Sequence, residues 1–346
     1  MNLSTQVMVL SGLMTGTIIT ASSNHWLVAW SGLELNMLSM LVIMVKPKHP
    51  RTAEATIKYF LTQAIASTLM LFSGTMNAIQ TGQWNITQMT DKYACTMLLL
   101  AMTMKVGAAP IYFWLPEVMQ GTTTTTALII ASWQKIAPIT ILFMVHNHLP
   151  PKITILIAMM SSIIGGWGSI NQTQMRKLMA YSSISNLGWT MVIFTISPHL
   201  AILNITIYIT MIIPMFMIMK KMSMKTLQDS TTMWTSSTTA NIMLTLMLLS
   251  VGGLPPLTGF TPKLLILNEL VMQNLMLVAT MMAMFSLINL FFYIRTTYIT
   301  AMTTPPIMTS NTTKWRLILT KQKLTSTLIP LSLISLPLTP TLMHMV

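Results

Sequence analysis

Four ionisable side chains lie inside long apolar stretches of the 346-residue sequence: Glu34, Lys105, Lys135 and Lys263. Such groups are costly to place in apolar surroundings, and within membrane-spanning segments they usually mark an ion pathway. A lysine kept away from water holds its proton less firmly, so it can release and regain it near neutral pH. The chemistry that these residue types predict is therefore proton exchange.

Glu34 and Lys135 are each near the middle of an apolar stretch. At 1.5 Å per residue, Glu34 lies about 13 Å from either end of its stretch, and Lys135 lies about 14 Å from the nearer end. A lysine side chain extends only roughly 6 Å, so it does not reach water from there. The alternatives are a protonated packing group at Glu34 and an interface-seeking lysine at Lys135, but the positions favour proton-exchanging sites.

Lys105 and Lys263 adjoin segments rich in glycine and proline. Lys105 directly precedes Val106 to Pro110, and Lys263 directly follows Gly252 to Pro262. Proline removes an amide donor and glycine eases unwinding, so we predict an interrupted helix at both places. The carbonyl groups freed by an interruption would stabilise an ammonium group. The alternative for both lysines is a side chain that extends from a helix end to water.

The sequence contains no recognisable site for redox or nucleotide chemistry. Cys95 is its single cysteine, which excludes an internal disulfide, an iron–sulfur cluster and a thiolate zinc site. No Walker loop, GxGxxG motif or metal-ligand cluster occurs in it. We therefore expect this chain to bind no cofactor.

The composition indicates which elements position these residues. Charged residues make up 7% of the chain and its mean hydropathy is +0.66, which excludes a soluble globular enzyme because water-facing surfaces need more charge. Apolar stretches of about 20 residues predict an all-α polytopic membrane protein with about eleven transmembrane helices. The expected spans are 3–22, 26–44, 55–79, 94–114, 124–144, 153–170, 176–196, 199–219, 239–265, 274–298 and 324–343.

Basic residues are distributed unevenly over the loops between these spans. If the spans alternate in direction, most of the 19 lysines and arginines fall on one side, whereas Lys92 and Lys152 fall on the other. The positive-inside rule then places the N-terminus inside and the C-terminus outside. This asymmetry accounts for the net charge of +13 without a nucleic-acid partner. Glu54 and Lys58 are expected to pair across one helical turn.

A weak internal repeat divides the chain. Val106 to Pro110 lies in the fourth expected span and the similar Val251 to Pro255 in the ninth. A repeat of five helices places its two copies in opposite orientations, which is typical of transporters with broken helices. We predict one transmembrane domain with a five-plus-five inverted repeat, formed by residues 1–150 and 151–300. A loop and C-terminal span follow in 301–346.

Several long motifs resemble one family over the full length of the chain. They are Trp26 to Met40 with Glu34, His49 to Ala55 running into Lys58 to Gln63, Lys105 to Gly107 with Phe113 to Val118, Trp133 to Lys135, Gly165 to Gln172, Ala180 to Ile184, and Gly252 to Phe260 with Lys263. With these motifs the sequence closely resembles the NADH–ubiquinone oxidoreductase chain 2 family in its vertebrate, mitochondrially encoded form.

The resemblance implies an antiporter-like core subunit in the membrane arm of respiratory complex I, a proton-translocating NADH:ubiquinone reductase. It implies a relay with Glu34 and Lys105 as the input pair, Lys135 as the central carrier and Lys263 as the last site. NADH, FMN, iron–sulfur clusters and ubiquinone are expected on other subunits. The expected partners are neighbouring antiporter-like and small hydrophobic chains, together with the lipid bilayer.

The same resemblance implies a location and reveals one departure. The implied location is the mitochondrial inner membrane, with the N-terminus on the matrix side and the C-terminus on the intermembrane-space side. Many relatives have a histidine at the position of Asn186. An asparagine does not take up and pass on a proton near neutral pH, so we expect Asn186 at most to orient water.

Two other functions are compatible with these residues. A stand-alone cation/proton antiporter of similar ancestry would work without partners. A structural subunit of a membrane arm, without pumping, would tolerate neutralisation of Glu34 or Lys135.

Overall fold

The computed structural model describes residues 3–235, 237–303 and 323–334, and this part of the chain is helical apart from loops and two isolated backbone bridges. The elements up to residue 148 are α1 (Leu3–Ser22), α2 (Trp26–Val45), α3 (Pro50–Thr81), α4 (Lys92–Val106), α5 (Trp114–Gly121), α6 (Thr124–Ala131), η1 (Trp133–Lys135), α7 (Ile136–Val145) and η2 (His146–His148). The elements after it are α8 (Pro151–Ile170), α9 (Met175–Phe194), α10 (Pro198–Lys221), α11 (Leu227–Thr232), η3 (Met233–Thr235), α12 (Thr238–Gly252), α13 (Phe260–Met272), α14 (Met276–Met302) and α15 (Lys323–Ile334). The η elements are short 3₁₀ turns.

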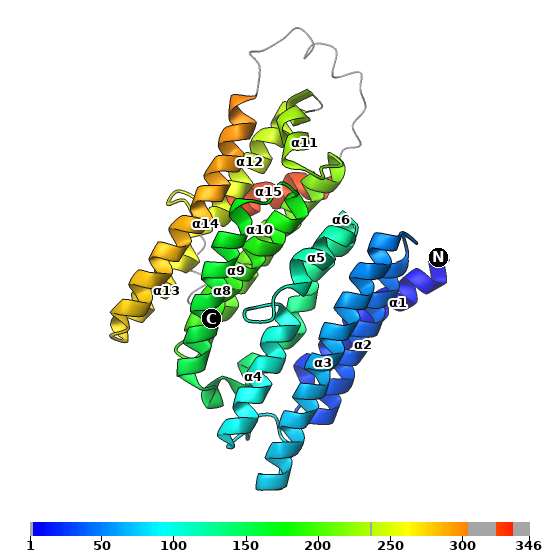
Figure 1. Ribbon diagram of the computed structural model, residues 1–346, viewed down its shortest axis with the longest axis vertical. Coiled ribbons are helices and arrows are strands. Elements are labelled where there is room, and N and C mark those ends of the chain that lie inside the picture. Colours follow the sequence, from blue (N-terminus) through cyan, green and yellow to red (C-terminus); the bar gives the residue numbers. More distant parts are fainter. Residues whose placement is uncertain (1–2, 236, 304–322, 335–346) are drawn as a thin grey trace.

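The long helices lie side by side along the long axis of the molecule. Figure 1 shows α1, α2 and α3 at one edge and α13 and α14 at the opposite edge, with the other long helices between them. Each of the eleven expected spans contains helix. The prediction of an all-α polytopic membrane protein is therefore confirmed.

Among the described residues, seven helical stretches are long and apolar enough to cross a membrane by themselves. They are Ser4–Ser22, Trp26–Val45, Pro50–Thr81, Thr124–His148, Pro151–Ile170, Pro198–Lys221 and Met276–Met302. The other expected spans are shorter, interrupted or more polar helices. Of the span expected at 324–343, the part beyond Ile334 lies outside the described residues. The division into two inverted halves and the sidedness of the termini stay predictions.

Helix α9 is buried along most of its length and packs closely against α8. Small residues make this approach possible, as is common between membrane helices. A Cβ atom on Gly165 would lie 2.6 Å from the backbone nitrogen of Ser185, and one on Gly188 would lie 2.7 Å from Oγ of Ser161. Helix α9 also packs against α10, so it holds the helices at the centre of the bundle together.

The two helix interruptions that the sequence predicts are confirmed. Helix α4 ends at Val106, where Gly107 adopts a left-handed conformation with φ of 84°. Helix α12 ends in the same way at Gly252, followed by Gly253 with φ of 86°. Only glycine adopts this conformation routinely, and prolines shortly afterwards prevent the helix from resuming at once. Non-helical segments of a few residues therefore follow both α4 and α12, before α5 and α13 begin.

A third interruption was not expected. The span predicted at 124–144 consists of α6, the 3₁₀ turn η1 and α7, and Lys135 is the last residue of η1. Pro138 explains the break. Its nitrogen has no hydrogen to donate to the carbonyl of Gln134, and its ring clashes with that carbonyl. All three buried lysines therefore adjoin an irregular backbone segment.

The close packing of α8 and α9 gives a first prediction. We expect Gly165→Ala to lower the free energy of unfolding by roughly 1–3 kcal/mol, because the added methyl group overpacks a tight contact. Gly12→Ala is the matched control, since a Cβ atom there would lie 3.4 Å from Cβ of Ser39. Thermal unfolding of the protein in membranes measures both. Equal unfolding temperatures for the two variants would contradict this packing.

Candidate functional site

Lys105 occupies the last turn of α4, immediately before the interruption, and its exposed fraction is 6%. Two side chains supply donors to the carbonyl groups that the helix end leaves free. Gln63 on α3 donates through Nε2 to the carbonyl of Lys105 at 3.3 Å, and Trp114 on α5 donates through Nε1 to that of Met104 at 3.1 Å. The buried helix end is thus tied to its neighbours on both sides, as such ends require.

Glu34 lies on α2, is partly exposed, and is within electrostatic reach of Lys105 and Tyr59. The structure does not bring Glu34 into contact with Lys105: among the described residues, the ion pairs within 4.0 Å all involve Lys58. The expected input pair is therefore a pair of neighbours whose charges act on each other across a gap.

A buried polar network lies between these residues and Lys135. Gln134 of η1 donates through Nε2 to Oδ1 of Asn36 on α2 at 3.0 Å, and the Tyr59 hydroxyl on α3 donates to Oε1 of Gln134 at 3.5 Å. Asn36 and Tyr59 are each 2% exposed. The network connects α2 and α3 to the turn that carries Lys135. We did not single out these residues from the sequence, although polar amides within apolar spans are the signal that could have revealed them.

Lys135 is 2% exposed, and its Nζ has no hydrogen-bond partner among the described residues. The Nζ atom lies 4.8 Å from the ring centroid of Tyr208 on α10. In its charged form the amine is attracted to the negative face of that ring, a cation–π contact that is stronger away from water. These surroundings therefore stabilise the charged form of Lys135 only weakly and do not neutralise its charge.

Lys263 lies in the first turn of α13 with an exposed fraction of 9%. Its Nζ donates to the carbonyl of Gly252, at the end of α12, at 2.7 Å. A Cβ atom on Gly253 would lie 2.8 Å from that Nζ, so the glycine also makes room for the amine. The carbonyl end of a broken helix therefore stabilises an ammonium group here, as we expected for the residues beside the interruptions.

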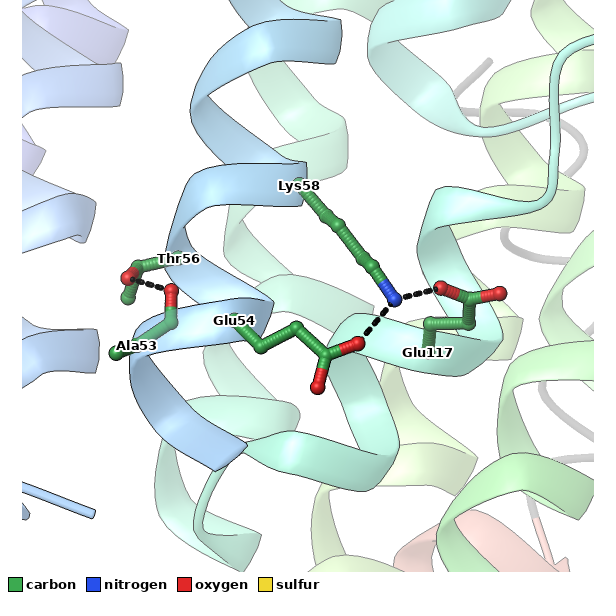
Figure 2. Close-up of polar contacts among 5 residues, drawn as sticks. All are labelled: Ala53, Glu54, Thr56, Lys58 and Glu117. Carbon is green, nitrogen blue, oxygen red and sulfur yellow. Dashed lines mark hydrogen bonds and ion pairs between the residues drawn. The ribbon is translucent and has the colours of Figure 1, made fainter. Parts of the chain in front are cut away.

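A second charged cluster joins α3 to α5 on the surface. Figure 2 shows Lys58 between two carboxylates, with Nζ 2.5 Å from Oε1 of Glu54 and 2.6 Å from Oε2 of Glu117. The predicted pairing of Glu54 with Lys58 is confirmed. The sequence did not predict that Glu117 joins this pair. The interruption after α4 brings Glu117 beside Lys58, and the spacing of the two residues in the sequence does not indicate this contact. The cluster borders a cavity of about 350 Å³ that Arg51 and Lys177 also line.

Comparison with known proteins identifies the family. The family model described as "NADH:quinone oxidoreductase/Mrp antiporter, TM" matches residues 23–291. The chain belongs to this family. Its match begins before Glu34 and ends after Lys263, so all four candidate site residues lie within it.

Two relatives that align with nearly the whole chain share one name. The protein called "NADH-ubiquinone oxidoreductase chain 2" from Varanus nebulosus is 49% identical over 336 residues, which cover 96% of this chain and 97% of that one. The protein of the same name from Loxodonta africana is 44% identical over 334 residues, with 96% of each chain covered. A chain of respiratory complex I from Thermus thermophilus shares the fold, with a TM-score of 0.83 at 23% identity over 94% of this chain and 76% of that one.

The Lys58 cluster gives a second prediction. Its side chains are 39%, 64% and 50% exposed, so each ion pair contributes little to stability. We expect Lys58→Met to lower the unfolding temperature slightly in low salt and less in high salt, because salt screens exposed charges. Lys177→Met is the control, since Lys177 lines the same cavity without an ion pair among the described residues. A salt-independent loss would contradict an electrostatic link between α3 and α5.

Proposed function

We propose that the chain is a proton-translocating, antiporter-like core subunit of the membrane arm of NADH:ubiquinone oxidoreductase, complex I. Its relay consists of Glu34, Lys105, Lys135 and Lys263. The observation that carries this proposal is that three lysines are buried at interrupted helices. Family membership and the name shared by the full-length relatives support it.

The proton relay begins with Glu34 and Lys105. Their separation lets each respond to the charge of the other without a fixed ion pair, and at low effective dielectric such an interaction reaches beyond direct contact. Gln63 holds the end of α4 beside α3, and Tyr59 lies one turn before Gln63 on the same helix. A change of charge at Lys105 therefore acts electrostatically on the network formed by Tyr59, Gln134 and Asn36.

The relay continues through Lys135 to Lys263. A change of charge at Lys105 alters the free energy of the charged form of Lys135, which then gives up or regains its proton. Lys263 has a carbonyl partner in Gly252 that favours its charged form, so it is suited to receive a proton at the end of the chain. A sequence of such steps moves protons laterally and releases them on one side.

The energy for pumping comes from other subunits. We propose that NADH, FMN, iron–sulfur clusters and ubiquinone bind elsewhere in the complex, and that electron transfer acts on this chain through its neighbours in the membrane arm. We also propose that the chain resides in the mitochondrial inner membrane with its N-terminus on the matrix side. The distribution of basic residues and the names of the relatives support this placement.

Lys135→Met in the assembled complex tests the proposal. We expect the rate of NADH-driven proton pumping to fall by at least about tenfold, because proton-transfer groups typically contribute more than that to a rate. Proton pumping and NADH oxidation are measured together in sealed vesicles, with the amount of assembled complex as reference. Lys152→Met on the exposed start of α8 is the matched control. Normal pumping by Lys135→Met would favour a structural subunit instead.

Glu34→Gln tests the input pair. The amide keeps the shape of the side chain but removes its charge, so Lys105 loses the carboxylate that acts on it. We expect slower coupled turnover with a normal amount of assembled complex. Glu269→Gln is the control, because Glu269 is also partly exposed but lies on α13. Unchanged turnover in Glu34→Gln would remove Glu34 from the relay.

A further inference from the structure

Buried polar atoms without a partner gather between Lys135 and the interruption that precedes Lys263. Among the described residues, no hydrogen-bond partner is found for Nζ of Lys135 or Nδ2 of Asn204. The buried hydroxyl groups of Tyr208 and Tyr293 have serine hydroxyls beside them, but neither makes a well-formed hydrogen bond. Asn204 and Tyr208 are 4% and 6% exposed. Buried polar groups in proteins are nearly always hydrogen-bonded, often through bound water. The polar atoms of this region can therefore form hydrogen bonds with bound water.

Two small cavities provide the space for it. The first, of about 10 Å³, is lined by Lys135, Asn186 and Tyr208 among other residues. The second, also about 10 Å³, is lined by Asn186, Tyr208, Asn204 and Pro262 among others. About 10–15 Å³ on this measure accommodates one water molecule. Each cavity thus fits a single water, and Tyr208 and Asn186 border both.

The surroundings of Tyr208 suit a hydroxyl that passes a proton. Its ring faces Nζ of Lys135, and its hydroxyl lies beside Ser183 and Ser182 and within electrostatic reach of Tyr293. The Ser182 hydroxyl donates to the carbonyl of Met179 at 2.7 Å, which leaves the serine oxygen free to accept. The Tyr208 hydroxyl therefore has acceptors beside it. The Lys135 amine lies over the ring rather than at the hydroxyl, so a proton passes between them only through a water molecule in the first cavity.

Asn186 has a different capability. Its Nδ2 donates to the carbonyl of Ser182 at 3.0 Å, which fixes the side-chain amide between the two cavities. An amide donates and accepts hydrogen bonds but does not exchange its protons near neutral pH. Asn186 can orient both waters, whereas a titrating step at this point needs another group.

The far end of this region reaches the interruption between α12 and α13. Pro262, which lines the second cavity, directly precedes Lys263. The Tyr293 ring packs on Gly252, where a Cβ atom would lie 3.1 Å from its Cδ2. The carbonyl of the same Gly252 accepts the hydrogen bond from Lys263. The second cavity therefore extends from Tyr208 to the residue before Lys263, and the Lys263 amine lies beyond it, at Gly252.

We infer that the Tyr208 hydroxyl, with one water molecule in each adjoining cavity, carries protons from Lys135 toward Lys263, and that Asn186 positions both waters. The Lys135 ammonium group gives a proton to the first water, which passes one to the phenol oxygen. The phenol releases its own proton to the second water, and the Lys263 amine receives it. One proton moves in total, and water and phenol regain their starting forms. The inference rests on the proposed function of the chain.

Tyr208→Phe in the assembled complex tests this role, because the substitution removes one oxygen and keeps the ring. We expect the protons pumped per NADH to fall to the level of Lys135→Met, with the assembled complex as reference. Tyr298→Phe is the control, since Tyr298 is 59% exposed on α14. Normal pumping by Tyr208→Phe beside a defective Lys135→Met would overturn this inference alone. Normal pumping by both variants would also contradict the proposed function.

A second-site variant separates proton transfer from packing. Histidine at position 186 borders both cavities and exchanges protons near neutral pH. We therefore expect the double variant Tyr208→Phe/Asn186→His to regain a large part of the pumping that Tyr208→Phe loses. A defect that Asn186→His leaves unchanged would assign Tyr208 a structural role and overturn the inference.

Discussion

The burial of three amines without a carboxylate in contact is the constraint on which the rest of the structure depends. Within the described residues, Lys105, Lys135 and Lys263 are nearly inaccessible, and the ion pairs within 4.0 Å all belong to Lys58. A charge at the centre of a membrane costs at least about 2.5–3.5 kcal/mol on the insertion scale. Each amine therefore has only partial compensation, and a modest change in nearby charge decides whether it keeps its proton.

The interrupted helices provide that partial compensation. At Lys263 it is the end carbonyl of α12, while at Lys135 the backbone turn directs the amine at the ring of Tyr208. Free backbone groups at each break need partners of their own, which explains why Gln63 and Trp114 donate to the end of α4. These irregular segments would weaken an ordinary helix bundle, but here they position the buried lysines.

The sequence predicted the helical membrane fold and two of the three interruptions, because apolar stretches, glycine and proline leave local signals. The choice of the four candidate residues rests on isolated charges and stays a prediction. The sequence did not predict the break at Lys135, since Pro138 acts three residues later in an otherwise apolar stretch. It also missed Asn36, Tyr208 and Glu117. Their contacts come from helices far apart in the chain, and only the packing of those helices brings them together.

In the proposed relay, Lys135 exchanges a proton rather than supplying a fixed charge. Lys135→Arg separates the two roles, because arginine keeps the positive charge but does not release its proton in proteins. The measurement is the number of protons pumped per NADH oxidised by the assembled complex in sealed vesicles. If Lys135 exchanges a proton, Lys135→Arg loses pumping as fully as Lys135→Met. Normal pumping by Lys135→Arg would show that a fixed positive charge is sufficient at this position.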